Sequence, residues 1–302
     1  MIRAGSRQLA LAFADSPSGD RYHIAEDESW GKQYLLHAAS VNNRKDRATS
    51  SAAAGDERTM ELVASAANLA QALLNVLRNK GASGVDGQTV EEMIKKTPNL
   101  LPNLLAALLQ GTYRPGEIRR VWIPKPGGGQ RGLGIPNVVD RWVQQAVLRI
   151  LEPIFEPTFH PSSHGFRPNR GAHTAVAEAK QHLQERYRVV VHLDLSKFFD
   201  RVHYQRLLNR LEQRVHNSRI LVLMKRMLTT KVVMPDGTKI ATVQETPQGG
   251  PLSPLLSNVV LDEWDQDLGR RGLRFVHYAD DCNIFVRISH SYDSCTHYTS
   301  PV

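Results

Sequence analysis

The segment Tyr278-Ala279-Asp280-Asp281 decides the fold, because it places two adjacent carboxylates between two apolar runs, Leu273–Tyr278 and Cys282–Ile288. Strand-like runs on either side of a short acidic segment indicate a hairpin with the two aspartates at or beside a tight turn. Burying unpaired carboxylates in such an apolar hairpin is very costly unless a metal ion or another cation neutralises them. The segment therefore predicts a β-hairpin whose acidic turn binds a cation.

A third carboxylate, Asp194, follows the short apolar run Val189–Leu193, which is typical of a buried central strand. The strand end and the hairpin turn can converge if the two elements are neighbours in one sheet. Three carboxylates can hold two divalent cations, and two metals about 3.5–4 Å apart can clamp the attacking and leaving oxygens of a phosphoryl displacement. A single aspartate at a strand end is more often a turn or cap residue. Together the three acids predict a nucleotidyl transferase.

Composition and charge limit the possible function classes. The chain has 302 residues, of which 41% are hydrophobic, so it can bury a core and is not a disordered chain; length alone allows one or two domains. The formal charge of +8 and the pI near 9.6 favour a polyanionic partner, since lysines and arginines that neutralise phosphates release counterions. A charge that serves only solubility is the alternative.

Cysteine usage and the apolar runs indicate the compartment. Cys282 and Cys295 form neither a C-x-x-C pair nor a disulfide framework, so a reducing compartment fits best, and we expect a cytoplasmic protein. The apolar run Leu9–Ala14 is short for a signal-peptide core of roughly 7–15 residues. No apolar run nears the roughly 18 residues of a membrane span, so no membrane partner is expected.

The pattern of the sequence divides the chain into four parts. Residues 1–55 show no sustained period and end in the linker-like Ser50–Gly55, so we expect a mobile leader. Residues 56–115 are mainly helical in spacing, residues 116–288 mix short strands with helices, and residues 289–302 predict an irregular tail. Helices are expected at Glu57–Lys80, from Thr89, at Leu104–Leu109, from Asp140 to about Leu151, and at Ala172–Tyr187, Tyr204–Arg214, Arg219–Leu228 and Leu252–Leu268. Thr89–Glu92 has the spacing of a capping box, and Asp140 can cap the helix that follows it. A small hairpin is expected to turn at Pro235–Gly237.

Two basic residues belong to a glycine-rich hairpin. The strand-like runs Arg119–Ile123 and Gly132–Ile135 flank Pro124–Gly129, which indicates a flexible hairpin tip. This arrangement presents Lys125 and Arg131 to the surroundings. Both cations match phosphate oxygens, the ammonium as a point charge and the guanidinium as a bidentate donor. A solvated hairpin is the alternative.

Seven segments identify a family. In order along the chain they are Asn79–Gly87, Ile123–Lys125 with Gly134–Pro136, Asp140-Arg141 with Gln144, Ser163–Pro168, Asp194–Asp200, Thr246–Pro254 and Tyr278–Asp281. On these segments, over roughly residues 60–288, the chain resembles the reverse transcriptases encoded by bacterial group II introns, the intron maturases. Retrons and diversity-generating elements are related alternatives, but the first and fourth segments fit group II introns better.

The resemblance implies an α+β fold with the fingers and palm of a right-hand polymerase, in which an antiparallel palm sheet packs on helices. Residues 116–288 would form the fingers and palm, and residues 56–115 a helical extension that contacts template or intron RNA. Asp194, Asp280 and Asp281 would be the catalytic metal ligands, together with the backbone carbonyl of Leu195. Two Mg²⁺ ions suit such hard oxygen ligands, and Mn²⁺ could substitute.

The resemblance also assigns nucleotide contacts. Lys125 and Arg131 would grip the incoming triphosphate. Phe199 resembles the bulky gate that would clash with a ribose 2′-hydroxyl and so favour deoxynucleotides, although simple core packing is equally compatible with it. Gln248 would line the nucleotide site, with a bare turn as the alternative.

Nucleic-acid contacts follow from two further segments. Gly249 and Gly250 would allow close backbone approach to the base pair or template. Arg167 and Arg170 lie in a loop with an aromatic residue, a mixture that tracks a single strand through charge and stacking. Capping of the helix that starts near Ala172, or pairing with acids, is nearly as well supported for these arginines.

The implied function is RNA-directed DNA synthesis, in which dNTPs are added to a DNA primer on an RNA template, together with a role in splicing and mobility of the intron RNA at its target DNA. Family members continue beyond the acidic hairpin through further palm strands and a helical thumb. The sequence after about Ile288 lacks that continuation, so we expect a truncated chain, with a tail that reflects a frameshift, an open sheet edge and marginal stability. A non-catalytic RNA-binding module and an inactive remnant are the competing interpretations.

Overall fold

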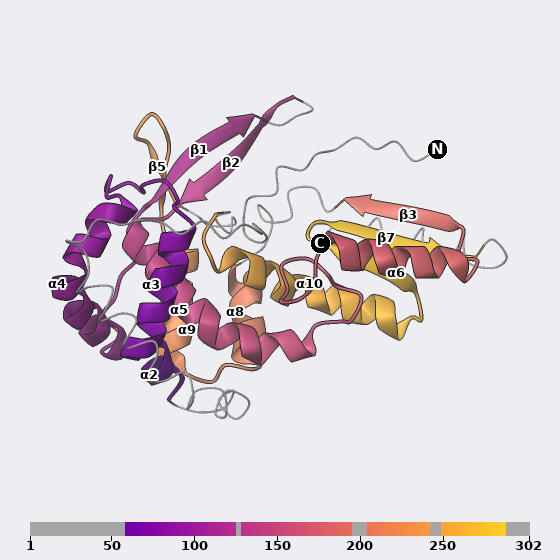
Figure 1. Cartoon of the computed structure of the whole chain (residues 1–302), viewed down its shortest axis with the longest axis horizontal. Helices are drawn as coiled ribbons and strands as arrows, with labels where there is room; N and C mark the ends of the chain where they lie inside the picture. Colours follow the sequence, from indigo (N-terminus) through magenta and orange to yellow (C-terminus); the bar gives the residue numbers. More distant parts are fainter. Residues whose placement is uncertain (1–57, 125–127, 195–203, 242–248, 288–302) are drawn as a thin grey trace, which may run out of the picture.

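The computed structural model describes residues 58–124, 128–194, 204–241 and 249–287 (Figure 1). The predicted leader and tail lie outside the described residues. So do four predicted site residues, which are Lys125, Leu195, Phe199 and Gln248. The described residues form helices together with two separate sheets, so the fold is α+β, as predicted.

Most helices share one core. The structure has α2 (Thr59–Val63), α3 (Ala66–Arg78), α4 (Val90–Leu109), α5 (Val138–Phe155), α8 (Tyr204–Glu212), α9 (Ser218–Leu228) and α10 (Ser253–Arg270). Trp142 of α5 is fully buried at its centre and donates its indole N–H to the Leu69 carbonyl at 2.6 Å. Leu252, Leu255 and Leu256 bring the start of α10 into the same cluster. We call these helices, together with the four-stranded sheet β2-β1-β4-β5 that is described below, the helical half.

The first helices differ from the prediction at two places. The expected helix Glu57–Lys80 is two helices, because the Ser65 side chain caps a new start at Ala66. The expected helices from Thr89 and at Leu104–Leu109 are the single helix α4, which keeps the predicted capping box although it contains two prolines. Burial of Met93, Leu104 and Leu108 against the core offsets the hydrogen bonds that the prolines remove.

The prediction that Asp140 caps a helix is also wrong. Helix α5 starts earlier, at Val138 after Asn137, and Asp140 instead accepts hydrogen bonds from the Tyr113 hydroxyl at 2.6 Å and the Gly116 N–H at 3.1 Å. The Asn137 side chain accepts from the N–H groups of residues 85 and 86. The start of α5 therefore ties down two loops that precede it in the chain.

The first sheet carries the basic hairpin. Its strand order is β2-β1-β4-β5, formed by β1 (Ile118–Pro124), β2 (Gln130–Ile135), β4 (Val232–Val233) and β5 (Lys239–Ile240). β1 and β2 pair antiparallel from Arg119 to Pro124, in the hairpin that was predicted, and project from the helical half (Figure 1). The small hairpin predicted near Asp236 is β4 and β5.

The second sheet is antiparallel with the order β3-β7-β6, formed by β3 (Val189–Asp194), β6 (Arg274–Tyr278) and β7 (Asp281–Val286). Helix α6 (Ala172–Gln184) and the second part of α10 pack against it. Phe275 and Ile284 belong to a small cluster with Leu268 of α10, whereas Val276 and Phe285 pack with Ala175 of α6. We call this sheet, α6, the end of α10, the 3₁₀ helix η3 (Glu156–Thr158) and the loop of residues 159–171 the sheet half.

The prediction that Val189–Leu193 is a central strand is wrong. Within the described residues β3 is an edge strand, and β7 is central. Alternate residues of β3 are exposed, including Val190 at 44%. A short apolar run does not by itself distinguish a strand buried on both faces from an edge strand that covers one face, and here the more buried β7 holds the central position.

The helices of the described residues include none that is both long and apolar enough to cross a membrane.

Candidate active site

The three predicted carboxylates meet at one end of the second sheet. Asp194, the last residue of β3, is the register partner of Asp281, the first residue of β7. Opposed residues of an antiparallel pair have Cα atoms about 4.5–5.5 Å apart and side chains on the same face. Asp280 lies in the turn between β6 and β7. Figure 1 shows that this end of the sheet faces the rest of the molecule.

The acidic turn is tight and strained. Tyr278 pairs with Asp281, so only Ala279 and Asp280 connect the two strands. Ala279 has φ of 59°, a left-handed conformation that alanine rarely adopts. Such strain persists only where the surroundings impose it.

The loop before α6 imposes that conformation. The His164 N–H donates to the His277 carbonyl at 2.8 Å, and the His277 N–H donates to the Ser162 carbonyl at 2.9 Å. This segment therefore continues the sheet beyond β6. A Cβ atom on Gly165 would lie 2.3 Å from the backbone nitrogen of Ala279, so only glycine allows this approach.

The carboxylates repel one another. Burial raises the pKa of Asp281, and the charges of Asp280 and Asp194 raise it further, against the opposing effect of His192 and His277. The His192 ring nitrogen Nε2 lies 3.9 Å from Asp281 Oδ1. Acids gathered in this way favour a bound cation, which would relieve the repulsion.

The donor chemistry suits a hard divalent cation. In the described part of the chain no three histidine, cysteine or acidic side chains form a ready-made metal site. Mg²⁺ commonly binds through one or two carboxylates and completes its shell with water and substrate phosphates, so it does not require an all-protein cage. The pair Asp194 and Asp281, with Asp280 beside it, therefore suits a metal that arrives with its substrate.

A buried hydrogen bond between a histidine and an aspartate lies next to the turn, and no pattern in the sequence indicated it. The His277 ring nitrogen Nδ1 lies 2.9 Å from Asp265 Oδ1, and both side chains are almost fully buried. Cys282, the register partner of His277, is also buried, and burial raises the pKa of its thiol. Asp265 lies on the buried face of α10, which was predicted as a helix without a role for this residue.

Of the two predicted phosphate-binding cations, the described residues include Arg131. It is exposed on β2 opposite Ile123, near the tip of the projecting hairpin. Trp122 and Ile123 of β1 are exposed as well. The hairpin therefore presents cationic and apolar groups away from the core.

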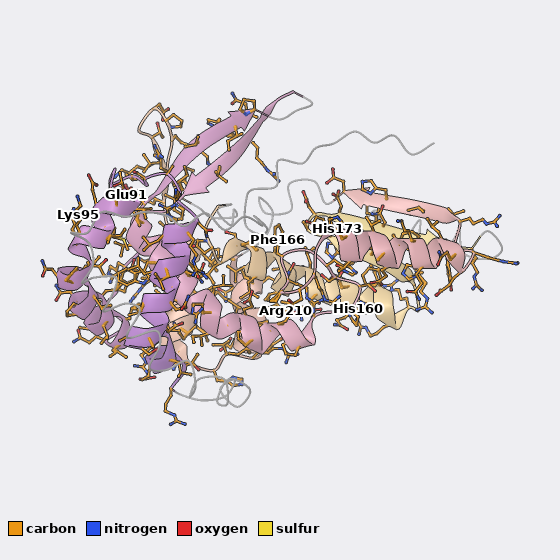
Figure 2. All side chains as sticks on the ribbon, viewed as in Figure 1. Glu91, Lys95, His160, Phe166, His173 and Arg210 are labelled. Atoms are coloured by element: carbon orange, nitrogen blue, oxygen red, sulfur yellow. The ribbon has the colours of Figure 1, made fainter. Side chains whose placement is uncertain are left out.

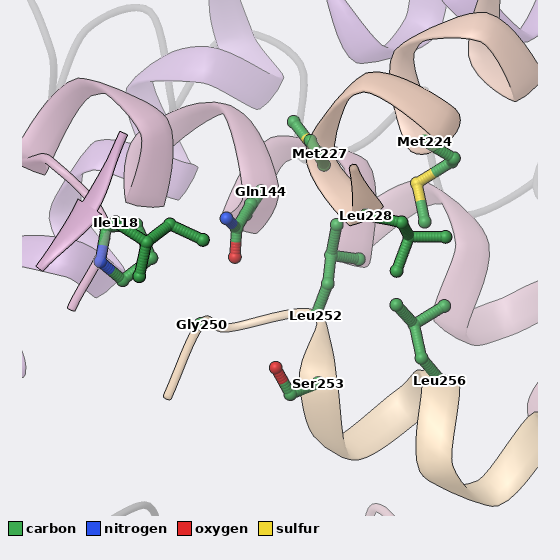
Figure 3. Close-up of a pocket in the computed structure, with 10 residues that line it drawn as sticks. Ile118, Gln144, Met224, Met227, Leu228, Gly250, Leu252, Ser253 and Leu256 are labelled. Atoms are coloured by element: carbon green, nitrogen blue, oxygen red, sulfur yellow. The ribbon is translucent and has the colours of Figure 1, made fainter. Parts of the chain in front are cut away.

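The backbone at Gly249 and Gly250 lies close to other parts of the same chain. Gly249 has φ of 122°, and a Cβ atom there would lie 2.2 Å from the Gly134 carbonyl oxygen. A Cβ atom on Gly250 would lie 2.2 Å from the Gln144 side chain, beside a cavity of about 30 Å³ (Figure 3). Internal packing and the positive φ therefore require a glycine at position 249, whereas a side chain at position 250 would displace the Gln144 side chain. The two residues join the start of α10 to β2 and α5.

Arg167, for which the sequence left open a contact with a nucleic acid strand or pairing with an acid, is paired with an acid in this structure. Arg167 is 8% exposed. Its Nε and Nη2 donate to the Glu156 carboxylate, and its remaining N–H groups donate to the carbonyls of Glu156, His160 and Ser163 at 2.8–3.2 Å. These contacts use all five donors of a guanidinium. Arg170 is half-buried and donates to the carbonyls of Pro161 and Ser163.

Comparisons with known proteins show which family the chain is similar to. Residues 123–298 match the family described as reverse transcriptase (RNA-dependent DNA polymerase). Protein YkfC of Escherichia coli is 40% identical over 224 residues, which are 72% of this chain and 58% of that protein. The group II intron-encoded protein LtrA of Lactococcus lactis is 34% identical over 232 residues, which are 72% of this chain and 37% of that protein.

More distant matches include a plant protein and a solved structure. Nuclear intron maturase 4 of Arabidopsis thaliana is 30% identical over 47% of this chain and 18% of its own length. Among solved structures, a partial Cas6-RT-Cas1–Cas2 complex aligns with a TM-score of 0.49 and 21% identity, over 79% of this chain and 40% of that one. The chain spans less than two thirds of the length of each of these proteins.

Proposed function

The chain belongs to the reverse transcriptase (RNA-dependent DNA polymerase) family, in the group of proteins encoded by group II introns, and on this premise we propose that its acidic sheet end performs nucleotidyl transfer. In this reaction the 3′-hydroxyl of a DNA primer, paired to an RNA template, attacks the α-phosphate of a dNTP, and pyrophosphate leaves. The observation that carries the proposal is the register pair Asp194 and Asp281, with Asp280 in the adjoining turn.

Each residue has a part in this proposal. Asp194, Asp280 and Asp281, with the carbonyl of Leu195, would hold two Mg²⁺ ions, or Mn²⁺ in their place. When bound, the metals lower the pKa of the primer hydroxyl and neutralise the triphosphate. The rigid turn keeps the carboxylates in place before substrate binds, so less of the binding energy is lost to ordering them.

The nucleotide contacts remain proposals of the same kind. Lys125 and Arg131 on the β1–β2 hairpin, the fingers, bind the triphosphate. Phe199 excludes a 2′-hydroxyl, and Gln248 lines the nucleotide site. Gly249 and Gly250 allow close backbone approach to the base pair or template. They also support the site through packing, because Gly249 lies against β2 and Gly250 against α5. Arg170, at the surface of the loop before α6, remains available to a phosphate.

The partners proposed for the whole protein are the intron RNA, a primed RNA template and target DNA, in the cytoplasm. The net charge of +8 also supports a second candidate, binding of intron RNA without polymerisation. The two functions separate cleanly, because phosphate binding by lysine and arginine does not require the three aspartates.

Primer extension tests the proposal. The purified chain, a DNA primer on an RNA template, dNTPs and Mg²⁺ should give extended primer. Asp280→Asn and Asp194→Asn should each reduce the rate by roughly 1,000-fold, since charge stabilisation by the metals contributes several kcal/mol. Asp236→Asn, at the exposed β4–β5 turn, is the matched control and should extend like the parent chain. Extension by the parent chain no greater than by Asp280→Asn, with RNA binding intact in both, would favour the binding function instead.

A further inference from the structure

An aromatic ring beside the acidic turn is both exposed and strained. Phe166 has φ of 56°, a left-handed conformation that is an outlier for a bulky residue. Its side chain is 48% exposed and belongs to none of the three hydrophobic clusters that the described residues form. Figure 2 shows Phe166 near the N-terminal end of α6, where His173 lies. Burial of the ring therefore does not explain the strain.

The backbone on both sides of Phe166 is fixed. On one side, Gly165 packs against the Ala279 backbone, and its carbonyl accepts a hydrogen bond from the buried Asn258 side chain at 2.9 Å. On the other side, Arg167 is held to Glu156 and to three carbonyls of the same region. These contacts hold the strained residue in place, so its ring has a fixed position one residue away from the contact with the acidic turn.

We propose that Phe166 is a stacking platform for a base of the RNA template strand. This inference rests on the proposed function and names a contact within that site. An uncharged ring offers nothing to a triphosphate or a metal ion, whereas every nucleobase has a π-face that can stack on it. Stacking is tolerant of sequence, as a template contact must be. A ring held in position also loses little conformational freedom on binding.

RNA binding in the absence of Mg²⁺ and dNTPs tests the platform separately from catalysis. The probe is a single-stranded RNA dodecamer with 2-aminopurine at successive positions, titrated with the whole chain. Phe166→Ala should weaken binding roughly 5-fold or more, which corresponds to the lower end of about 1–3 kcal/mol per stacked base. The quenching of 2-aminopurine at one position should also be lost. Val222→Ala, which removes a similarly exposed apolar side chain from α9, should change neither.

Two further variants separate stacking from other roles. Phe166→Trp should bind within about 2-fold of the parent chain, because its ring stacks at least as well, while Phe166→Leu should be as weak as Phe166→Ala. Phe166→Gly relieves the left-handed strain, so it should raise the melting temperature or leave it unchanged and still lose RNA affinity. A merely structural role predicts a lower melting temperature for Phe166→Gly.

The outcomes also distinguish this inference from the proposed function. Asp280→Asn should bind the RNA probe like the parent chain, with unchanged 2-aminopurine quenching. If the parent chain extends primers but Phe166→Ala and Phe166→Leu bind RNA unchanged, the platform is refuted and the polymerase stands. If Phe166→Leu alone retains affinity, the contact is apolar without stacking, which also overturns the inference. Loss of binding in Phe166→Ala with rescue by Phe166→Trp supports the platform, even if no primer is extended.

Discussion

The helical half and the sheet half differ in how they bury apolar side chains. The helical half has one large cluster drawn from seven helices, with Trp142, Leu69 and Leu73 fully buried. The sheet half has two small clusters, one on each face of a three-stranded sheet, and an exposed strand β3. The acids lie in the half with the smaller cores. We infer that the helical half sets global stability, while local contacts determine whether the acidic end keeps its shape.

The largest expected effect comes from the centre of the helical half. Trp142→Ala should lower the free energy of unfolding by about 3–5 kcal/mol, because it empties a fully buried site and leaves the Leu69 carbonyl without its donor. Urea unfolding followed by circular dichroism measures this. Trp122→Ala, on the exposed β1, is the control and should stay within about 1 kcal/mol of the parent chain. Equal losses for the two tryptophans would contradict a single dominant core.

A smaller effect is the dependence of the free energy of unfolding on pH. It distinguishes the buried acid of the helical half, Asp140, from the clustered acids of the sheet half. Burial raises the pKa of Asp140 from 3.8 to about 6, against the opposing hydrogen bonds from Tyr113 and Gly116. Between about pH 4 and 6 the folded chain therefore holds a proton that the unfolded chain has released. The stability contributed by this proton is fully present below pH 4 and is lost as pH rises through 6.

Asp140→Asn removes this titration. The free energy of unfolding of the parent chain, measured relative to Asp140→Asn, should fall by about 3 kcal/mol between pH 4 and pH 7, because a tenfold difference in proton affinity between the folded and unfolded chains corresponds to about 1.4 kcal/mol. Urea unfolding of both chains across this range measures the difference, and the comparison cancels the titration of Asp281. A constant difference from pH 4 to 7 would show that Asp140 titrates normally.

The next largest effect is expected where the loop before α6 holds the acidic turn. Gly165→Ala forces a Cβ atom to within 2.3 Å of the Ala279 nitrogen, so the loop and the turn must separate, at a cost of about 1–3 kcal/mol. Hydrogen exchange should increase at the amides of residues 164 and 277 and stay unchanged in α3 and α5. Gly171→Ala is the matched control, because a Cβ atom there meets no other atom within 4 Å. If hydrogen exchange at these amides is equally slow in both variants, the loop does not hold the turn.

The sequence predicted the local elements of both halves better than their mutual contacts. The acidic hairpin, the β1–β2 hairpin and the capping box at Thr89 each depend on a few neighbouring residues, and each was found as predicted. The edge position of β3 and the contacts of Arg167 depend on residues outside the local segment, which only the folded chain brings together. A buried arginine and an RNA-binding arginine look the same in a sequence, and only the position of Glu156 distinguishes them.

Two adjacent valines of β3 provide the finest test of the comparison. Val191 belongs to the side of the sheet that packs on α10, whereas Val190 is exposed on the opposite face. Val191→Thr should lower the free energy of unfolding by about 1–2 kcal/mol, because it places a hydroxyl against an apolar cluster. Val190→Thr should change it by less than about 0.5 kcal/mol, as for other surface substitutions. The two substitutions are chemically identical, so the difference between their effects reports how well each face of β3 is buried and not the type of residue. Equal losses would mean that both faces of β3 are covered.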